Sequence, residues 1–361
     1  SLIQTAINGS KRGAVVCVNP GTYTGNLVFS GQAVTVQSTT PLGAILHGTG
    51  GTVVSFLNGD ASTLDGFQIT GGTGAGGGGI RVDSSSPMIQ NCLVTGNTAT
   101  ASSHPQGAGA YIAGSKAAPL IRCTCFQGNH SNFIGGGLES AYLAHPYLSH
   151  DTFVSNTAPY GAGISVEFDG LVSVENSEFL ANVANIDGGA VHVLGPFGNA
   201  DIRRTVLLAN TAGSNGGALW IPAGFATVLN SIFDSNKASN GGAAATDFDG
   251  VLTVESSILV NNTTTGGVGT AALSAGSAPA TLVENFNLFF NNVPAGPGGT
   301  FFDTTGNLGN LFSDPKFGTK CYNLSPTSPA LHTGLPDLHF NNTDGTRNSM
   351  GVYGGPTFPF P

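Results

Sequence analysis

The stretch 171–194, LVSVENSEFLANVANIDGGAVHVL, holds one complete unit of a repeat that runs through most of the chain. It contains a strand-like run, an apolar-x-x-Asn motif, a Gly-rich tripeptide and a second apolar alternation. The apolar-x-x-Asn motif recurs with Asn-to-Asn steps of 32, 27, 26, 28, 26 and 26 residues at Val94–Asn97, Phe126–Asn129, Phe153–Asn156, Phe179–Asn182, Leu207–Asn210, Phe233–Asn236 and Leu259–Asn262. A fixed period of this length indicates a solenoid in which each unit is one coil.

A single coil of this length cannot bury its own inward side chains, so coils must stack at the strand spacing of about 4.8 Å. We therefore expect an all-β fold, a right-handed parallel β-helix built as a single-stranded solenoid. A disordered Gly-rich chain would lack phased Phe, Val, Ile and Leu. A β-propeller is excluded because its blades need about 40 residues or more.

Two sets of aligned residues are expected to hold neighbouring coils together. The Phe residues that share one phase of the repeat should stack into an internal aromatic column: Phe126, Phe153, Phe179 and Phe233. Six residues before the repeat Asn, three coils carry Asn91, Asn176 and Asn230. Because Asn tolerates left-handed turns and bonds from coil to coil, we expect a partial Asn ladder there.

The ends of the chain depart from the repeat, and we expect one domain with a cap at each end. Residues 1–12 should form a helical N-terminal cap, because apolar residues at 2, 3, 6 and 7 share one helical face. Residues 13–84 should form irregular first coils and residues 85–295 the regular solenoid. Residues 296–361, rich in Pro, Gly and aromatics, should form a tail that folds over the last coil, since open edges must be covered.

Composition excludes several classes of function. The 361 residues carry 11 Lys and Arg against 20 Asp and Glu, a net charge of −9, which disfavours nucleic acid and anionic membranes as partners. The five cysteines fit no zinc-binding spacing. No apolar run reaches the roughly 18 residues that span a bilayer. A start at Ser1 fits removal of a signal peptide, so we expect a secreted or cell-surface protein.

The two ends and the centre of the chain resemble known extracellular proteins. The segments 18–23 (VNPGTY) and 64–72 (LDGFQITGG), with the tail segments 328–334 (SPALHTG) and 344–354, resemble bacterial secreted right-handed parallel β-helix repeat proteins of the surface-anchored type. The central repeats are similar to those of chlamydial polymorphic outer-membrane proteins, which act as adhesins. The resemblance implies this fold, pectate-lyase-like in architecture, and an extracellular setting, and leaves activity open because the fold also carries polysaccharide lyases.

Acidic residues recur in a pattern that a glycoside hydrolase would need, namely carboxylates on one face. Glu167 and Asp169 are followed 80 residues later by Asp247 and Asp249, about three coils away. At the coil spacing these two groups should lie about 14 Å apart, beyond the roughly 5–9.5 Å of a catalytic carboxylate pair. Asp-Gly turn chemistry is the favoured interpretation of these residues, and they are the catalytic candidates that we retain. Glu139 and Asp187, from neighbouring Gly-rich segments, could contribute.

The candidate residues for a lyase reaction or for metal binding are weaker. A polysaccharide lyase needs a cationic or imidazole base, and Arg203-Arg204 with Asp201 is the nearest cluster, better explained as a turn. His145 and His150 flank one strand and should point to opposite faces, so a metal pair is not expected. Asp344, in an Asn-Thr-Asp-Gly stretch, is a weak candidate for Ca²⁺ and lacks further acidic ligands. Apart from Ca²⁺, no cofactor is expected.

The repeat favours a non-enzymatic function. We expect a rigid extracellular rod on the cell surface or in the matrix, which binds a glycan or protein surface or assembles into fibres. The alternative from a different class is a carbohydrate-active enzyme, either a polysaccharide lyase or a glycoside hydrolase, or a glycan-binding module on the same fold. Ice binding would require regular Thr-x-Thr columns, which the aligned coils lack.

Overall fold

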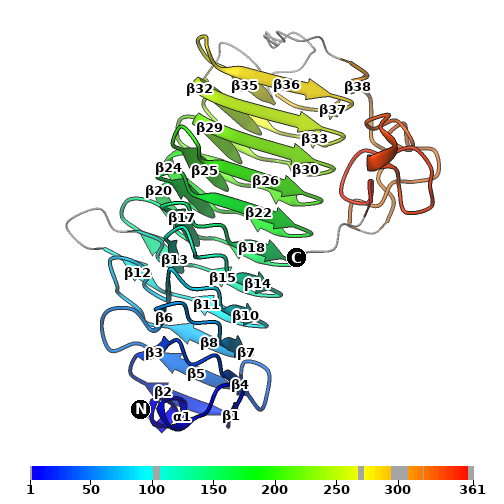
Figure 1. The fold of residues 1–361 in the computed structure, drawn as a ribbon. Helices are drawn as coiled ribbons and strands as arrows, with labels where there is room; N and C mark the ends of the chain where they lie inside the picture. Colours follow the sequence, from blue (N-terminus) through cyan, green and yellow to red (C-terminus); the bar gives the residue numbers. More distant parts are fainter. Residues whose placement is uncertain (1, 101–105, 267–271, 294–307, 320, 357–361) are drawn as a thin grey trace.

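A right-handed parallel β-helix of about ten turns forms the body of the protein (Figure 1). The computed structural model describes residues 2–100, 106–266, 272–293, 308–319 and 321–356. The predicted boundary at residue 295 lies outside these residues. Every strand pairing within the three sheets is parallel, as expected when each coil places the same strand above its predecessor.

The 19-stranded sheet contains two parallel ladders, joined where two long strands run through both. The first ladder contains β3 (Leu27–Ser30), β6 (Val54–Leu57), β9 (Ile80–Asp83), β13 (Ala110–Ala113), β17 (Leu138–Ala141), β21 (Ile164–Glu167), β25 (Val191–Leu194), β29 (Leu219–Leu229), β32 (Ala244–Glu255) and β35 (Leu273–Ala275). The second contains β1 (Val15–Val18), β4 (Thr35–Ser38), β7 (Thr63–Asp65), β10 (Met88–Gln90), β14 (Leu120–Arg122), β18 (Tyr147–Ser149), β22 (Leu171–Glu175), β26 (Asn199–Arg203), the same β29 and β32, and β36 (Thr281–Asn285).

Two further sheets complete each coil. The 12-stranded sheet contains β2 (Gly21–Thr24), β5 (Ala44–His47), β8 (Phe67–Thr70), β11 (Leu93–Thr95), β15 (Cys125–Gln127), β19 (Thr152–Val154), β23 (Glu178–Leu180), β27 (Val206–Leu208), β30 (Ile232–Asp234), β33 (Ile258–Val260), β37 (Leu288–Phe290) and β38 (Leu311–Phe312). The 7-stranded sheet contains β12 (Thr98–Ala99), β16 (His130–Ser131), β20 (Thr157–Tyr160), β24 (Val183–Asp187), β28 (Thr211–Ala212), β31 (Lys237–Ala238) and β34 (Thr263–Thr264). This last sheet starts only at residue 98, so the earlier coils have fewer strands.

The inward positions of the 12-stranded sheet form the aromatic column. The rings of Phe126, Phe153 and Phe179 stack with centroids 4.8 Å apart at interplanar angles of 5–6°. Leu207 occupies the next coil, and Phe233 follows it in the same register. All five side chains are fully buried. One side chain per coil therefore fills the same interior site, and the core is as periodic as the sequence.

The structure contains an Asn ladder, but its continuous form lies at a different position of the repeat from the predicted one. Asn91, Asn176 and Asn230 sit in a left-handed turn (φ 54°, 50° and 49°) but do not bond to one another. The continuous ladder is made by the repeat Asn itself, because each side chain bonds the next one up at 2.9–3.0 Å: Asn97, Asn129, Asn156, Asn182, Asn210, Asn236, Asn262 and Asn292. All eight are buried, where an unpaired amide would be costly.

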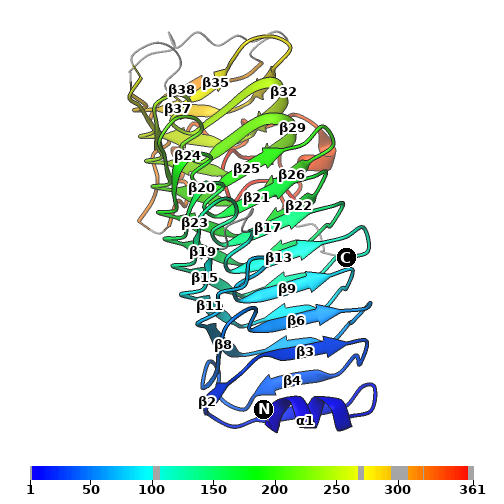
Figure 2. The ribbon, with the colours of Figure 1, turned by 90° about the vertical axis from the view of Figure 1, so that its left-hand side faces the viewer.

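The N-terminal cap is the helix α1 (Leu2–Gly9), which buries Ile3 and Ile7 against the first coil (Figure 2). The expected cap over the last coil includes residues 296–307, which lie outside the described residues, so it stays a prediction. After β38 pairs with β37, residues 321–356, with the short helix η1 (Leu338–Phe340), lie beside the upper coils (Figure 1). Ala330 and Met350 pack against Ile232 and Ile258 on the solenoid flank. This described part of the tail therefore covers a side of the coils.

Candidate active site

The outward face of the first ladder carries an unusual column of side chains. Tyr111, Glu139, Ser165, His192 and Trp220 occupy the same register position on β13, β17, β21, β25 and β29. Because strand side chains alternate, these residues should face solvent while their neighbours fill the core. All five are instead buried, with exposed fractions of 0–6%.

Gly-rich turns that cover the column explain this burial. A Cβ added at Gly135 would lie 3.0 Å from the Cβ of Glu139, and one added at Gly188 would lie 3.1 Å from the Cβ of His192. Both glycines also have positive φ, at 61° and 66°. The recurrent glycines thus allow the chain to pass directly over the column.

Glu167 lies two residues along β21 from Ser165 and forms the centre of a polar cluster. Its Oε1 accepts a hydrogen bond from Ser165 Oγ at 2.9 Å and lies 3.1 Å from Nδ1 of His192. The Glu167 and His192 side chains are only 7% and 4% exposed. The His192 ring also packs against Tyr160, with centroids 5.5 Å apart. These contacts fix both titratable groups in one orientation.

Glu139 lies next to this cluster and is fully buried. Neither of its carboxyl oxygens has a hydrogen-bond partner among the residues that the structure describes. Burial, reinforced by the neighbouring charge of Glu167, holds the pKa of Glu139 well above its ordinary value. Burial therefore favours the protonated form of Glu139, next to the Glu167 cluster.

A hollow of about 470 Å³ opens over these residues, and we call it the carboxyl cavity. It is lined by Phe133, Ile134, Tyr160, Glu167, Asp187, His192, Leu194, Asn215, Trp220, Pro222, Asp247 and Phe248. Asp187, at the end of β24, accepts hydrogen bonds from the backbone N and the Nδ2 of Asn215 at 2.8 and 2.9 Å. These two donors stabilise its carboxylate within the cavity.

The chemistry of the lining is acidic and aromatic. Three carboxyl groups and one imidazole reach the cavity, among rings from Phe133, Tyr160, Trp220 and Phe248, while no Lys or Arg belongs to its described lining. Concave, largely apolar hollows with a few convergent polar groups are the typical sites for small ligands. Perturbed titratable groups beside such a hollow are typical of catalytic sites.

The four acidic residues that the sequence offered as catalytic candidates fall into two pairs in the structure. Glu167 and Asp247 both line the carboxyl cavity, three coils apart as expected, with Asp187 as a third carboxyl from another sheet. Asp247 Oδ1 accepts from Phe248 N and Ser277 N, at 2.8 and 3.0 Å, as a turn residue does. Asp169 Oδ1 accepts from Phe197 N at 3.2 Å in the neighbouring turn, and Asp249 is exposed outside the cavity.

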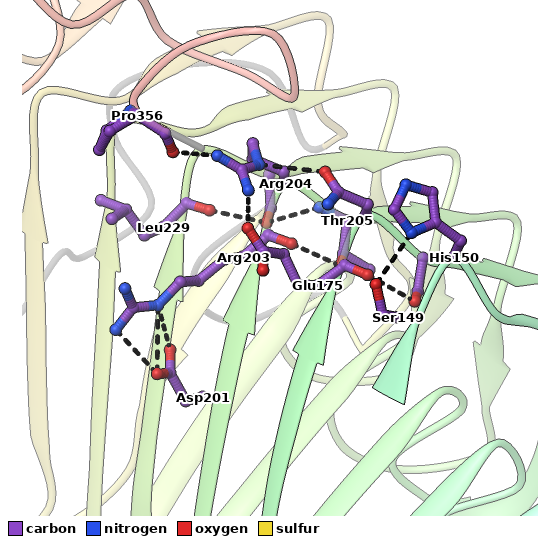
Figure 3. Close-up of polar contacts among 12 residues, drawn as sticks. Ser149, His150, Glu175, Asp201, Arg203, Arg204, Thr205, Leu229 and Pro356 are labelled. Carbon is purple, nitrogen blue, oxygen red and sulfur yellow. Dashed lines mark hydrogen bonds and ion pairs between the residues drawn. The ribbon is translucent and has the colours of Figure 1, made fainter. Parts of the chain in front are cut away.

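The basic cluster has a structural role (Figure 3). Arg203 forms a two-pronged pair with Asp201 on the same strand, at 2.8–3.1 Å. Arg204 pairs with buried Glu175 and also donates to the carbonyl oxygen of Pro356, so it ties the tail to the flank. With their donors committed to these partners, the two arginines offer little to a substrate. Arg204 stands in the turn, as the sequence indicated, and Arg203 is the last residue of β26.

The remaining chemical candidates form no site. Asp344 Oδ1 accepts hydrogen bonds from N and Oγ1 of Thr346, which close a local turn and lower the pKa of Asp344. Throughout the described ranges, no group of three His, Cys, Asp or Glu residues is arranged to hold a metal ion. All five cysteines are free thiols. Among the same residues, no helix is long and apolar enough to cross a membrane.

Sequence reasoning missed His192, Trp220 and the burial of Glu139 as parts of one site. A signal was present, since each column residue stands two positions after the Gly-rich tripeptide of its coil, as Glu139 does after Gly137. Alignment on the tripeptide places Tyr, Glu, Ser, His and Trp in successive coils. The covering turns could not be foreseen, because their path depends on how neighbouring coils pack.

Comparison with known proteins identifies the fold. No family model and no curated protein matches the sequence. Among solved structures, the pectate lyase Pel9A is similar with a TM-score of 0.61 and 14% identity, over 97% of this chain and 90% of that one. A PL6 alginate lyase in complex with a trisaccharide gives a TM-score of 0.47 and 12% identity, over 81% of this chain and 77% of that one. The chain is thus similar in fold, along almost its whole length, to a pectate lyase.

Proposed function

We propose that the chain is a carbohydrate-active enzyme that hydrolyses glycosidic bonds of a neutral polysaccharide in the carboxyl cavity. The observation that carries the proposal is the convergence of Glu167, Asp187 and Asp247 with His192 in one aromatic-lined hollow. Glycoside hydrolysis needs two carboxyl groups, one to protonate the leaving oxygen and one to activate water or attack the sugar. Aromatic rings in the lining would pack against the apolar C–H faces of sugar rings.

The roles follow from the surroundings of each carboxyl group. Glu167 is buried beside His192 and lines the cavity, so we assign to it the transfer of a proton to the glycosidic oxygen. Asp187, stabilised as a carboxylate by Asn215, is placed to take a proton from the attacking water. The glycosidic C–O bond breaks as its oxygen takes the proton from Glu167, and the hydroxyl of water bonds to the sugar carbon while Asp187 takes the other water proton. That proton returns to Glu167 through solvent before the next turnover.

The charge of the cavity decides between neutral and acidic glycans. A uronate polymer would bring carboxylates against Glu167, Asp187 and Asp247 with no Lys or Arg in the described lining to offset them. A neutral chain meets no such repulsion, and its hydroxyls can donate to the same oxygens. The likeness to Pel9A, a pectate lyase, supports a polysaccharide-active protein on this fold and leaves the reaction to be decided by the site.

The non-enzymatic rod that the repeat favoured finds no support, since a rod needs no buried column of titratable groups. Self-assembly into fibres likewise has no supporting contact. An extracellular polysaccharide would be the partner, and we place the protein outside the cell on that ground. A glycan-binding module on the same fold is the remaining competitor, and product release distinguishes it from an enzyme.

The test is a panel of polysaccharides assayed for two products. Neutral β-glucan, xylan and mannan are incubated with the protein alongside polygalacturonate and alginate, and reducing ends and unsaturated ends are both measured. We expect new reducing ends from at least one neutral polymer, with no ultraviolet absorbance from unsaturated sugars. Unsaturated ends from a uronate polymer would show a lyase and overturn the proposal, as would binding without any product.

A further inference from the structure

Exposed aromatic side chains gather along one edge of the solenoid, at the turn between the two ladders of the 19-stranded sheet. Tyr142 follows β17, Phe168 follows β21, Phe197 follows β25, and Phe248 lies in the middle of β32. Their exposed fractions are 49%, 51%, 70% and 61%. We call these four residues the aromatic ridge. Large apolar side chains that are exposed in a row indicate a binding surface more often than isolated ones do.

The backbone at these turns adopts a conformation that is unfavourable for bulky residues. Tyr142, Phe168 and Phe248 have φ of 54°, 49° and 46°, in the left-handed region. Leu143 and Asp169 also have positive φ, so two of the turns have left-handed residues at both central positions, where Asn-Gly is the favoured pair. A bulky residue there costs about 1–2 kcal/mol. Gly or Asn would fit the backbone at these positions with less strain.

The ridge is continuous with the carboxyl cavity. Phe248 belongs to both, and Leu194, which ends the strand before Phe197, also lines the cavity. At the other end, the Tyr142 and Phe168 rings stack 4.8 Å apart at 2°, matching the coil spacing. Four coil steps separate β17 from β32, so the ridge extends about 19 Å along the axis. This length suits an extended chain of several sugars.

Carboxyl groups beside the aromatic ridge could accept hydrogen bonds from the hydroxyls of a sugar chain. Phe168 and Phe248 each have an acidic residue on both sides in sequence, and of these Asp169 and Asp249 lie outside the lining of the cavity. They can accept hydrogen bonds from sugar hydroxyls and would repel an acidic polymer. A neutral pyranose chain has apolar C–H faces, which pack on aromatic rings, and hydroxyls, which donate to carboxyl oxygens. The ridge and its neighbouring acidic residues offer both kinds of partner.

We propose that the aromatic ridge is the outer binding track of the neutral polysaccharide that is cleaved in the carboxyl cavity. This inference rests on the proposed function and names its substrate class: a long neutral chain, held over several coils, in place of a short oligosaccharide. The track contributes affinity for the polymer, while the cavity performs the reaction.

The experiment compares a polymer with its own tetrasaccharide. The variant Tyr142→Asn with Phe168→Asn removes two rings, and because Asn tolerates the left-handed region it relieves backbone cost. Leu338→Asn, at an 83% exposed position on η1, is the matched control. We expect the double variant to raise KM for the polymer at least tenfold, to leave kcat/KM for the tetrasaccharide within twofold, and the control to change neither.

Three results would overturn the inference. One is an unchanged KM for the polymer in the double variant, and another is an equal loss of kcat/KM on both substrates. The third is a concentration-dependent dimer of the wild type, seen by analytical ultracentrifugation, that the double variant abolishes while polymer binding persists.

If the wild type cleaves nothing, the proposed function fails, and retention of β-glucan, xylan and mannan in affinity electrophoresis then tests the ridge separately. Loss of retention in the double variant alone supports it, and equal retention contradicts it.

Discussion

At the scale of single residues, the stack is held by side chains that are satisfied only by their copies in the next coil. Asn156 Oδ1 accepts from both N and Nδ2 of Asn129, while its own Nδ2 donates to Asn182 Oδ1 and to the carbonyl oxygen of Phe126. Every one of these atoms is buried, so water cannot replace a lost partner. The ladder is therefore an all-or-none arrangement within each coil.

Substitution of Asn156 tests this arrangement. Asn156→Ala leaves buried donors and acceptors unpaired in two neighbouring coils, and we expect a loss of about 2–4 kcal/mol in the free energy of unfolding. Asn132→Ala, at an exposed position beside the same turn, should stay within about 0.5 kcal/mol. Urea denaturation followed by circular dichroism measures both. Equal effects of the two substitutions would contradict the ladder's role.

Asp151 is an acidic member of a turn column that also contains Thr124 and Ser177. Its two carboxyl oxygens accept from the backbone N of Thr124 and of Ser149, at 2.8 and 2.9 Å. Burial outweighs these hydrogen bonds and raises the pKa of Asp151 from 3.8 to about 8. In the next coil Ser177 takes the same position, and its Oγ accepts from Asp151 N and donates to the carbonyl oxygen of Glu175.

The raised pKa predicts an unusual pH dependence of stability. Between pH 4 and 8 the folded chain holds a proton on Asp151 that the unfolded chain releases, so stability falls as pH rises, by at most about 1.4 kcal/mol per unit. Asp151→Ser should reduce this slope, to which buried Glu139 also contributes, and should stabilise the protein at pH 9, because serine reproduces the turn of the neighbouring coil. Thermal unfolding from pH 4 to 9 measures it, and a parallel slope in the variant would refute the assignment.

At the scale of elements, a polar contact at Asn230 helps to attach the tail segment, beside the apolar packing of Ala330 and Met350. Asn230 Nδ2 donates to the carbonyl oxygen of Ser349 at 2.7 Å and to Asn348 Oδ1 at 3.0 Å, and Ser256 Oγ accepts from Leu335 N at 2.9 Å. Asn230 is thus a turn residue used to dock residues far along the chain. This explains why it looked like a ladder position in the sequence.

Removal of this contact should loosen the tail and leave the solenoid folded. In Asn230→Ala we expect limited proteolysis to cut within 321–356 at least tenfold faster, since a lost buried bond of about 1.4 kcal/mol changes the open population tenfold. Asn91→Ala, in the same left-handed turn where no tail docks, is the control. Proteolysis of the solenoid itself in Asn230→Ala would show that the tail is integral to the coils.

The sequence predicted the coil because a period is visible in the residues that face inward. Phe126, Phe153 and Phe179 determine the stacking register, and the structure places them in one column. The ladder was misplaced although Asn97 and its successors recur in every central coil, since Asn suits both left-handed turns and ladders. The docking of the tail and the burial of Glu139 depend on contacts between distant segments, which periodicity does not encode.

At the scale of the whole molecule, the stacking of coils in register brings residues that are distant in sequence into one site. Glu167 and Asp247 are 80 residues apart by number, yet both line one cavity because stacking brings residues of successive coils to the same face. A parallel solenoid can therefore build a site by substitution of outward residues alone, while the inward ones keep the fold. This separation explains why the sequence reveals the fold so clearly and the chemistry so weakly.

The most direct test of the central claim, that the carboxyl cavity cleaves a glycan, is the turnover of Glu167→Gln on the neutral polymer that the wild type cleaves. Glutamine preserves size and removes the proton transfer, so we expect kcat to fall at least 10²-fold with unchanged folding. Glu178→Gln, on β23 outside the cavity, should keep wild-type turnover. Turnover in Glu167→Gln within twofold of the wild type would contradict the assignment of the active site.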